Sequence, residues 1–114
     1  MEDTIFDKIL KGDIPSEKVY EDENVLAFHD VDPQAPVHVI VIPKIKVEKF
    51  SELKDSPIED TGIFFKNVAK VAYDLGLDKK GYRIVINSGE YGQQSVNYLH
   101  AHILGERKLN WPPG

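Results

Sequence analysis

The stretch that decides the fold reads Gln94-Ser95-Val96-Asn97-Tyr98-Leu99-His100-Ala101-His102-Ile103-Leu104-Gly105. Its pattern is that of a β-strand, in which alternate side chains point to the same face. The imidazoles of His100 and His102 therefore leave one face together. Adjacent same-face positions of a strand this apolar are normally core residues rather than titratable rings. We expect this strand to carry a functional site as well as part of the core.

Length and composition indicate one globular domain covering residues 1–114. The chain has 114 residues, of which 41% are hydrophobic and 29% charged, as in ordinary soluble proteins. No apolar run approaches the ~20 residues that span a bilayer. The opening residues, Met1-Glu2-Asp3-Thr4, lack a basic segment followed by an apolar one. We expect a cytoplasmic protein with no membrane partner.

Charge and cysteine content exclude several classes of function. The net charge of −5 argues against a nucleic-acid partner, which normally binds a basic patch. The absence of cysteine removes disulfides, thiolate nucleophiles and zinc–thiolate sites. If the protein binds a phosphate, backbone amides and a few placed side chains must hold it, because bulk positive charge is lacking.

Two helices are predicted. A short helix covers residues 5–11, with a capping residue in the preceding Asp3-Thr4 and Gly12 as its stop. A long helix follows Ser56, which can cap it. Its apolar residues recur at helical spacing up to Leu75, and Gly76 can end it. We expect this long helix to pack on one face of a sheet.

Five strands are predicted, over residues 18–21, 25–29, 38–43, 82–87 and 94–105. The first two form a hairpin, and the third, apolar on both faces, is central. Hairpin-length connections make the sheet mainly antiparallel. With the two helices, the predicted fold class is α+β.

The pair of His100 and His102 permits three interpretations. Both can be hydrogen-bonded core residues, or they can join His38 as three nitrogen ligands of a catalytic zinc ion. In the third interpretation, one neutral imidazole is a nucleophile at pH 7, since the usual pKa of histidine is about 6.5. The neighbouring ring would then donate to phosphoryl oxygens or to the leaving group.

The surroundings of the pair favour phosphate over metal. No acidic residue that would support zinc-binding histidines lies between Glu90 and Glu106. Asp30, at a strand end, is suited to accept hydrogen bonds from a ribose diol, or else it caps its own loop. Small or amide-bearing residues that can donate to an anion lie nearby: Asn87, Ser88, Gly89, Gly92, Gln93, Gln94 and Ser95.

A series of short blocks resembles the histidine-triad superfamily, and most closely its Hint branch of histidine-triad nucleotide-binding proteins. The blocks run in uninterrupted order from residue 3 to the end, which is more specific than any single His-x-His pattern. They are Asp3-Thr4-Ile5-Phe6, Leu26-Ala27-Phe28-His29-Asp30, Pro33-Gln34-Ala35-Pro36-Val37-His38, Val41-Ile42-Pro43-Lys44, Gly81-Tyr82-Arg83, Asn87, Gln94-Ser95-Val96, His100-Ala101-His102 and Trp111-Pro112-Pro113-Gly114.

This resemblance implies a homodimer whose two five-stranded sheets join into one ten-stranded sheet. It also implies metal-free hydrolysis of purine nucleoside phosphoramidates and aminoacyl-type adenylates, releasing AMP or GMP. His100 would form a covalent nucleotidyl-histidine intermediate, His102 would contact the phosphate, and His38 would orient the nucleophile. Residues implied to line the site are Ser95, Asn87, Gln93, Gln94 and Tyr98 near the phosphate, Asp30 at the ribose, Phe6, Ile9, Ile14, Phe28, His29 and Val31 around base and sugar, and Trp111, whose tail reaches the partner's site.

Four positions depart from the pattern of the family. Tyr98 stands in place of the first histidine of the triad, Lys46 and Asn110 replace histidines, and Gln93 replaces a glycine. A phenol can still donate a hydrogen bond, so we expect retained activity; the alternative is a purine nucleotide-binding module with little turnover. The missing histidines also argue against a zinc site, and we expect no cofactor.

Overall fold

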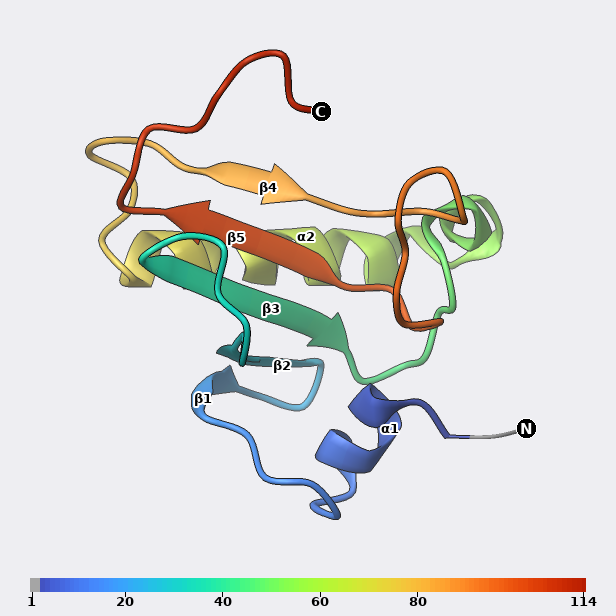
Figure 1. The fold of residues 1–114 in the computed structure, drawn as a ribbon. Coiled ribbons are helices and arrows are strands. Elements are labelled where there is room, and N and C mark those ends of the chain that lie inside the picture. Colours follow the sequence, from blue (N-terminus) through green and yellow to red (C-terminus); the bar gives the residue numbers. More distant parts are fainter. Residues whose placement is uncertain (1–2) are drawn as a thin grey trace.

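A computed structural model describes residues 3–114, so Met1 and Glu2 of the expected domain lie outside the described residues. One sheet of five strands carries a long helix on one face and a short helix on the other (Figure 1). The predicted α+β class is therefore confirmed. The elements are α1 (Ile5–Leu10), β1 (Lys18–Glu21), β2 (Val25–His29), β3 (Val37–Pro43), the 3₁₀-helix η1 (Phe50–Asp55), α2 (Ile58–Asp74), β4 (Arg83–Val85) and β5 (Ala101–Gly105).

The sheet has the order β1-β2-β3-β5-β4, and every neighbouring pair is antiparallel. β3 is central, as its apolar character on both faces predicted. β3 and β4 run parallel on the two sides of β5, so the chain must cross between them through η1 and α2. This crossover places α2 against the sheet.

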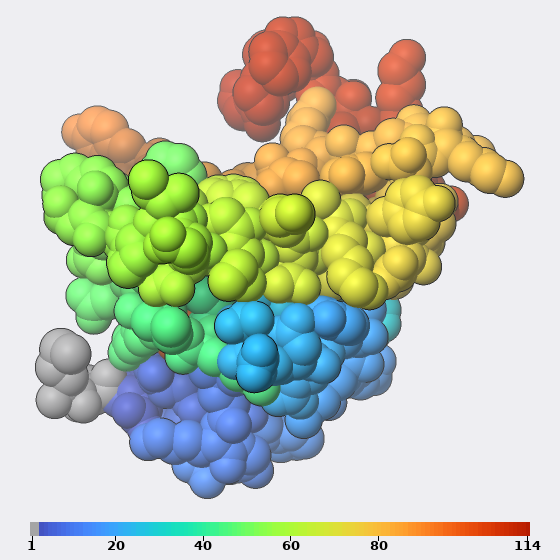
Figure 2. Space-filling model, turned by 180° about the vertical axis from the view of Figure 1, so that it is seen from behind, coloured from blue at the N-terminus to red at the C-terminus, as the bar shows by residue number. Residues whose placement is uncertain are grey.

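Alternating strand residues divide the core into two clusters, one on each face of the sheet. Figure 2, seen from behind, shows the residues of α2 lying across one of these faces. The buried cluster on this face includes Val25, Ala27, Val39, Val41, Phe64, Val68, Val71 and Ala72. The cluster on the α1 face consists of Phe6, Ile9, Leu26, Phe28, Ile40, Ile42 and Tyr98.

The helix ends follow the predicted signals at three of four positions. Thr4 caps α1 in a reciprocal pair with Asp7, and Gly76, with a φ of +77°, follows the end of α2. The predicted capping by Ser56 is wrong, because Pro57 is the N-cap and the Ser56 hydroxyl donates to the Glu52 carbonyl. Within residues 3–114, no helix has the length and apolar character needed to cross a membrane.

The fifth strand is shorter than predicted, because it begins at Ala101 rather than at residue 94. The backbone N–H of Leu99 donates to the carbonyl of Val47 instead of to a neighbouring strand, and the N–H of Tyr98 donates to Val96. Side chains nevertheless keep alternating, since Leu99 packs in the α2 cluster and Tyr98 in the α1 cluster. β4 is likewise limited to residues 83–85.

Candidate active site

Three histidines meet on the α1 face of the sheet. His38 lies on β3, His102 lies on β5 opposite Ile40, and His100 directly precedes β5. The ring centroids of His100 and His102 are 4.9 Å apart, and those of His38 and His102 are 5.1 Å apart. The two imidazoles of the opening stretch thus share a face, as their spacing predicted. His38 joins them from the neighbouring strand.

Hydrogen-bond partners determine the tautomers of His38 and His102. The amide N–H of Gln34 donates to Nδ1 of His38 at 3.0 Å, so in the neutral ring Nδ1 is bare and Nε2 carries the proton. This Nε2 lies 2.8 Å from Nδ1 of His102 and donates to it. The proton of the neutral His102 ring must then be on its own Nε2. A donor is therefore prepared at Nε2 of His102 for an incoming ligand.

A different contact determines the tautomer of His100. Its Nδ1 lies 2.7 Å from the backbone carbonyl of Tyr98, which can only accept, so Nδ1 carries the proton. Its Nε2 has no hydrogen-bond partner within residues 3–114, where the single buried side-chain polar atom without a partner is Oγ1 of Thr61. Nε2 of His100 therefore reaches the surface of the site with a free lone pair, as a nucleophile requires.

His38 contacts a different ring from the one expected. We expected His38 to orient His100, but its ring contacts His102 across the β3–β5 pair. The main chain of Tyr98 orients His100 instead. Sequence reasoning missed both this carbonyl and the N–H of Gln34, because every residue has such main-chain groups and they leave no pattern.

Burial keeps all three rings neutral at pH 7. It is the main cause that lowers the pKa of His38 and of His100, against the opposing charge of Asp30. The pKa of His102 falls to about 4, because burial acts together with the neighbouring His100 and His38. A neutral His100 has the free electron pair needed for attack on phosphorus. A neutral His102 keeps one N–H to donate.

The same contacts test whether the residues fit a metal ion. Asp30, His38 and His102 bring their potential ligand atoms within 4.8 Å of one another. A histidine that binds zinc normally donates its other ring N–H to an acceptor. Nδ1 of His38 does the reverse and accepts from Gln34, so Nε2 holds a proton where a metal would need a lone pair. Neither this set nor the alternative set of His38, His100 and His102 weighed from the sequence fits zinc in this arrangement.

The residues predicted around base and sugar fall into two groups. His29 and Val31 are exposed at the end of β2, beside Asp30, which accepts from the N–H of Asp32 and so also caps its loop. Ile14 packs at the margin of the α1 cluster. Phe6, Ile9 and Phe28 are buried in that cluster, and the ring of Phe6 contacts the ring of His100. Tyr98, predicted near the phosphate, is buried in the same cluster.

The loop of residues 87–95 is braced largely by its own amide side chains. The Asn87 side chain donates to the Gly92 carbonyl at 2.7 Å. Gln93 is exposed, with a φ of +62°, and Ser95 is exposed next to the histidine segment. The Gln94 amide is fully engaged with backbone groups, namely the N–H of Gly89 and the carbonyls of Glu48 and Val96. Asn87 and Gln94 therefore shape the loop, and Ser95 has its side chain at the surface.

The C-terminal tail passes β4 at the edge of the sheet (Figure 1). Arg83 of β4 donates to the carbonyl of Asn110 at 2.9 Å, and its guanidinium lies 5.8 Å from the centre of the Trp111 ring. Trp111 is still 80% exposed. Its ring is therefore available to a further surface beyond this chain.

Comparison with known proteins identifies the family. A model of the HIT domain matches residues 11–109. The chain belongs to the HIT domain family. A 14 kDa zinc-binding protein from Zea mays is 50% identical over 113 residues, which cover 97% of this chain and 88% of the relative. An adenylylsulfatase HINT1 from Arabidopsis thaliana is 46% identical over 113 residues, or 97% of this chain and 76% of the relative.

A solved structure agrees with the family assignment. The HIT family hydrolase from Legionella pneumophila Philadelphia 1 superposes with a TM-score of 0.92 at 40% identity. The match covers 98% of this chain and 100% of that chain. The resemblance to histidine-triad proteins of the Hint branch is thus confirmed, and with it the general class of HIT family hydrolases and nucleotide-binding proteins.

Proposed function

We propose that this HIT protein hydrolyses purine nucleoside phosphoramidates and aminoacyl-type adenylates through a nucleotidyl-His100 intermediate. The observation that carries the proposal is the pair of assigned tautomers. His100 has a bare Nε2 and His102 a protonated Nε2, on rings whose centroids are 4.9 Å apart. A neutral nucleophile thus lies next to a hydrogen-bond donor for the phosphoryl group that it attacks.

The first step transfers the nucleotide to the protein. Nε2 of His100 attacks phosphorus while the N–H of His102 donates to a phosphoryl oxygen and stabilises its negative charge. The bond from phosphorus to the leaving amine breaks. The amine keeps the electron pair of that bond and takes a proton from the water molecule that reacts next.

The second step releases the product. The oxygen of that water attacks phosphorus, and the bond between phosphorus and Nε2 of His100 breaks, which restores the neutral imidazole. The products are the nucleoside monophosphate and the free amine, with one water consumed. His102 donates to the phosphoryl group in both steps. His38 donates to Nδ1 of His102, so the proton of the His102 ring stays on Nε2 of His102.

The name of the Arabidopsis relative suggests a further substrate for comparison, adenylyl sulfate. Its leaving group is sulfate, which departs as a stable anion and needs no proton. Both substrates present the same phosphorus to His100. We propose that either can form the nucleotidyl-histidine, and that they differ only in the departure of the leaving group.

We also propose that residues 1–114 form a single HIT domain that assembles into a homodimer through β4. β4 lies at the edge of the sheet, and Trp111 is 80% exposed beside it. A hollow of about 310 Å³ lies between the tail and the β4–β5 pair, which leaves room for residues of a second copy. Light scattering on the purified protein tests this proposal, and a monomer at micromolar concentration would contradict it.

Turnover of an AMP-amine by the wild type and by His100→Ala tests the proposed reaction. We expect turnover by the wild type only, while His100→Ala still binds AMP, because the ring is removed and the rest of the site is kept. Equal rates for the two proteins would refute a role for His100 as nucleophile. A wild type that binds AMP but stays at the background rate would support the binding-module alternative.

A further inference from the structure

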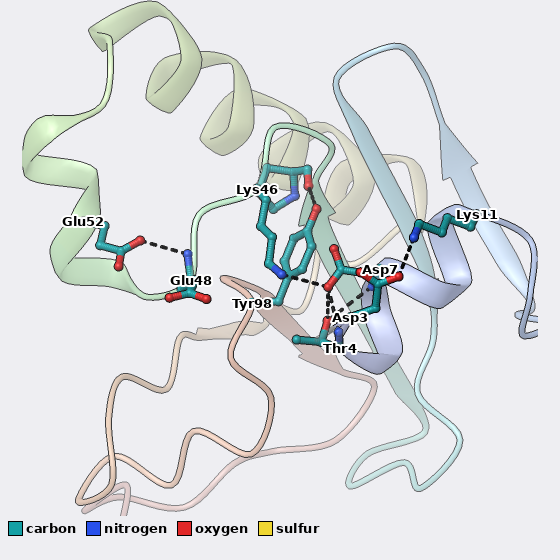
Figure 3. A network of polar contacts seen from close by, with 9 residues as sticks. Asp3, Thr4, Asp7, Lys11, Lys46, Glu48, Glu52 and Tyr98 are labelled. Carbon is teal, nitrogen blue, oxygen red and sulfur yellow. Dashed lines mark hydrogen bonds and ion pairs between the residues drawn. The ribbon is translucent and has the colours of Figure 1, made fainter. Parts of the chain in front are cut away.

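A polar network joins three segments of the chain (Figure 3). Tyr98 precedes His100, Lys46 follows β3, and Asp7 lies on α1. Figure 3 shows the Lys46 side chain lying along Tyr98 with its ammonium directed at Asp7. The ammonium is 5.6 Å from the centre of the Tyr98 ring and 2.9 Å from Oδ2 of Asp7. This geometry combines a cation–π contact with an ion pair.

The far end of the network is firmly held by α1. Oδ2 of Asp7 accepts from both the N–H and the hydroxyl of Thr4, at 2.8 Å each, in addition to Lys46. Burial alone would raise the pKa of Asp7, but hydrogen bonds from Lys46 and Thr4 hold it below its usual value. Asp7 is therefore charged at pH 7, and it keeps Lys46 over the tyrosine ring.

The near end of the network holds the segment that carries the nucleophile. The phenol of Tyr98 is buried and donates to the carbonyl of Pro43, at the end of β3. Tyr98 lies outside β5, so the sheet does not fix its backbone. The N–H of Leu99, in the same peptide group as the Tyr98 carbonyl, bonds to the Val47 carbonyl, and the side chain of Tyr98 supplies a second anchor. The carbonyl of the same residue accepts from Nδ1 of His100 at 2.7 Å.

A second contact connects the same helix with the nucleophile. The ring of Phe6, next to Asp7 on α1, meets the ring of His100 edge-on with centroids 4.9 Å apart. It also meets the ring of Tyr98 at 6.1 Å. The position of α1 therefore affects both the imidazole and the residue whose carbonyl orients it.

We propose that Tyr98, Lys46 and Asp7 form a positioning group that fixes the Tyr98 carbonyl and thereby keeps the proton of His100 on Nδ1. Lys46 and Tyr98 are two of the positions that depart from the family pattern, and the structure places them in direct contact. The phenol and the ammonium act jointly, since the ring that anchors the carbonyl is itself covered by the cation. The catalytic consequence rests on the proposed function, whereas the choice of tautomer does not.

Nitrogen-15 NMR of the imidazole rings tests the choice of tautomer directly, without any substrate. The variants are Tyr98→Phe, which removes the phenol hydroxyl, and Lys46→Met, which removes the cation at similar length. Lys44→Met is a matched control, because Lys44 pairs with Glu21 at 2.8 Å and is about as exposed as Lys46. We expect His100 to be an Nδ1–H tautomer in the wild type and the control. In the two test variants, a population with the proton on Nε2 should appear.

An unchanged tautomer of His100 in both test variants would overturn the proposal. Lys46→Met keeps the test valid even if Tyr98→Phe fails to fold, because the Lys46 side chain is partly exposed. A change in Lys44→Met equal to that in Lys46→Met would also overturn it, since any lost surface ion pair would then have the same effect.

Kinetics with an AMP-amine give a second readout. We expect kcat to fall about tenfold in Lys46→Met with KM within about twofold of wild type, because misplacing a nucleophile slows chemistry more than binding. Lys46→Arg, which keeps the cation, should recover most of kcat. A loss confined to KM would contradict the proposal. A wild type without turnover would refute the proposed function alone, and the NMR result would still decide the tautomer question.

Discussion

Lowering the pH from 7 to 5 should destabilise the protein mainly through the half-buried His102 and the buried His38 and His100. In the folded state burial and the neighbouring rings lower the pKa of His102 from 6.5 to about 4. The unfolded chain therefore binds a proton at His102 below pH 6.5, whereas the folded protein binds it only near pH 4. Because the unfolded state takes up more protons in this window, the free energy of unfolding falls as the pH falls.

The size of the effect follows from the two pKa values. Between pH 7 and pH 5, a group that titrates at 6.5 unfolded and at about 4 folded changes the free energy of unfolding by about 2 kcal/mol. His38 and His100 add to the loss in the same direction, since burial lowers the pKa of each. Carboxylates contribute little in this range, because they titrate mostly below it.

Urea unfolding of the wild type and of His102→Gln at pH 7, 6 and 5 measures this contribution. Glutamine cannot titrate, and its amide oxygen can still accept from Nε2 of His38. The wild type should lose about 2 kcal/mol more than His102→Gln between pH 7 and pH 5. Parallel losses in the two proteins would show that His102 is not held as a neutral ring, which would refute the electrostatic account of the site.

Three further predictions concern the loop beside the histidines. Gln93→Gly should raise the free energy of unfolding by up to about 1 kcal/mol, because Gln93 has a φ of +62° that glycine adopts without strain. A free energy of unfolding below that of the wild type, measured by urea unfolding, would contradict this. Gly92→Ala should lower stability by more than about 1 kcal/mol and reduce turnover, since its Cβ would lie 2.5 Å from the backbone oxygen of Ser88; wild-type melting and activity would show that the loop yields. Gln94→Leu, which removes the bonds to three backbone groups, should cost about 1–3 kcal/mol by urea unfolding, and an unchanged midpoint would oppose the bracing role.

Local patterns predicted the elements of the fold well where the determinant is itself local. Thr4 begins α1 through a contact three residues away, and β3 is central because its own residues are apolar on both faces. The start of β5 was missed for the opposite reason. The N–H of Leu99 donates to the carbonyl of Val47, which is far away in the sequence, and the residues around Leu99 do not indicate this partner.

In the candidate site, too, local features were predictable from the sequence and long-range contacts were not. Side-chain identity and spacing were enough to predict that the rings of His100 and His102 share one face of the sheet. The neighbour of His38 could not be predicted, because it depends on how β3 and β5 pair. The contact between Tyr98 and Lys46 could not be predicted either. The two residues depart from the family pattern at positions far apart in the sequence, and only the fold shows that they are neighbours.

The central claim is that the nucleotide passes through a covalent bond to Nε2 of His100. The most direct test is to stop the reaction of the wild type with an AMP-amine rapidly and without acid, and then to analyse the protein by proteolysis and mass spectrometry. We predict a peptide containing His100 that carries one nucleoside monophosphate, and no such adduct in His100→Ala. Turnover by the wild type without any adduct on this peptide, or an adduct retained in His100→Ala, would contradict the account.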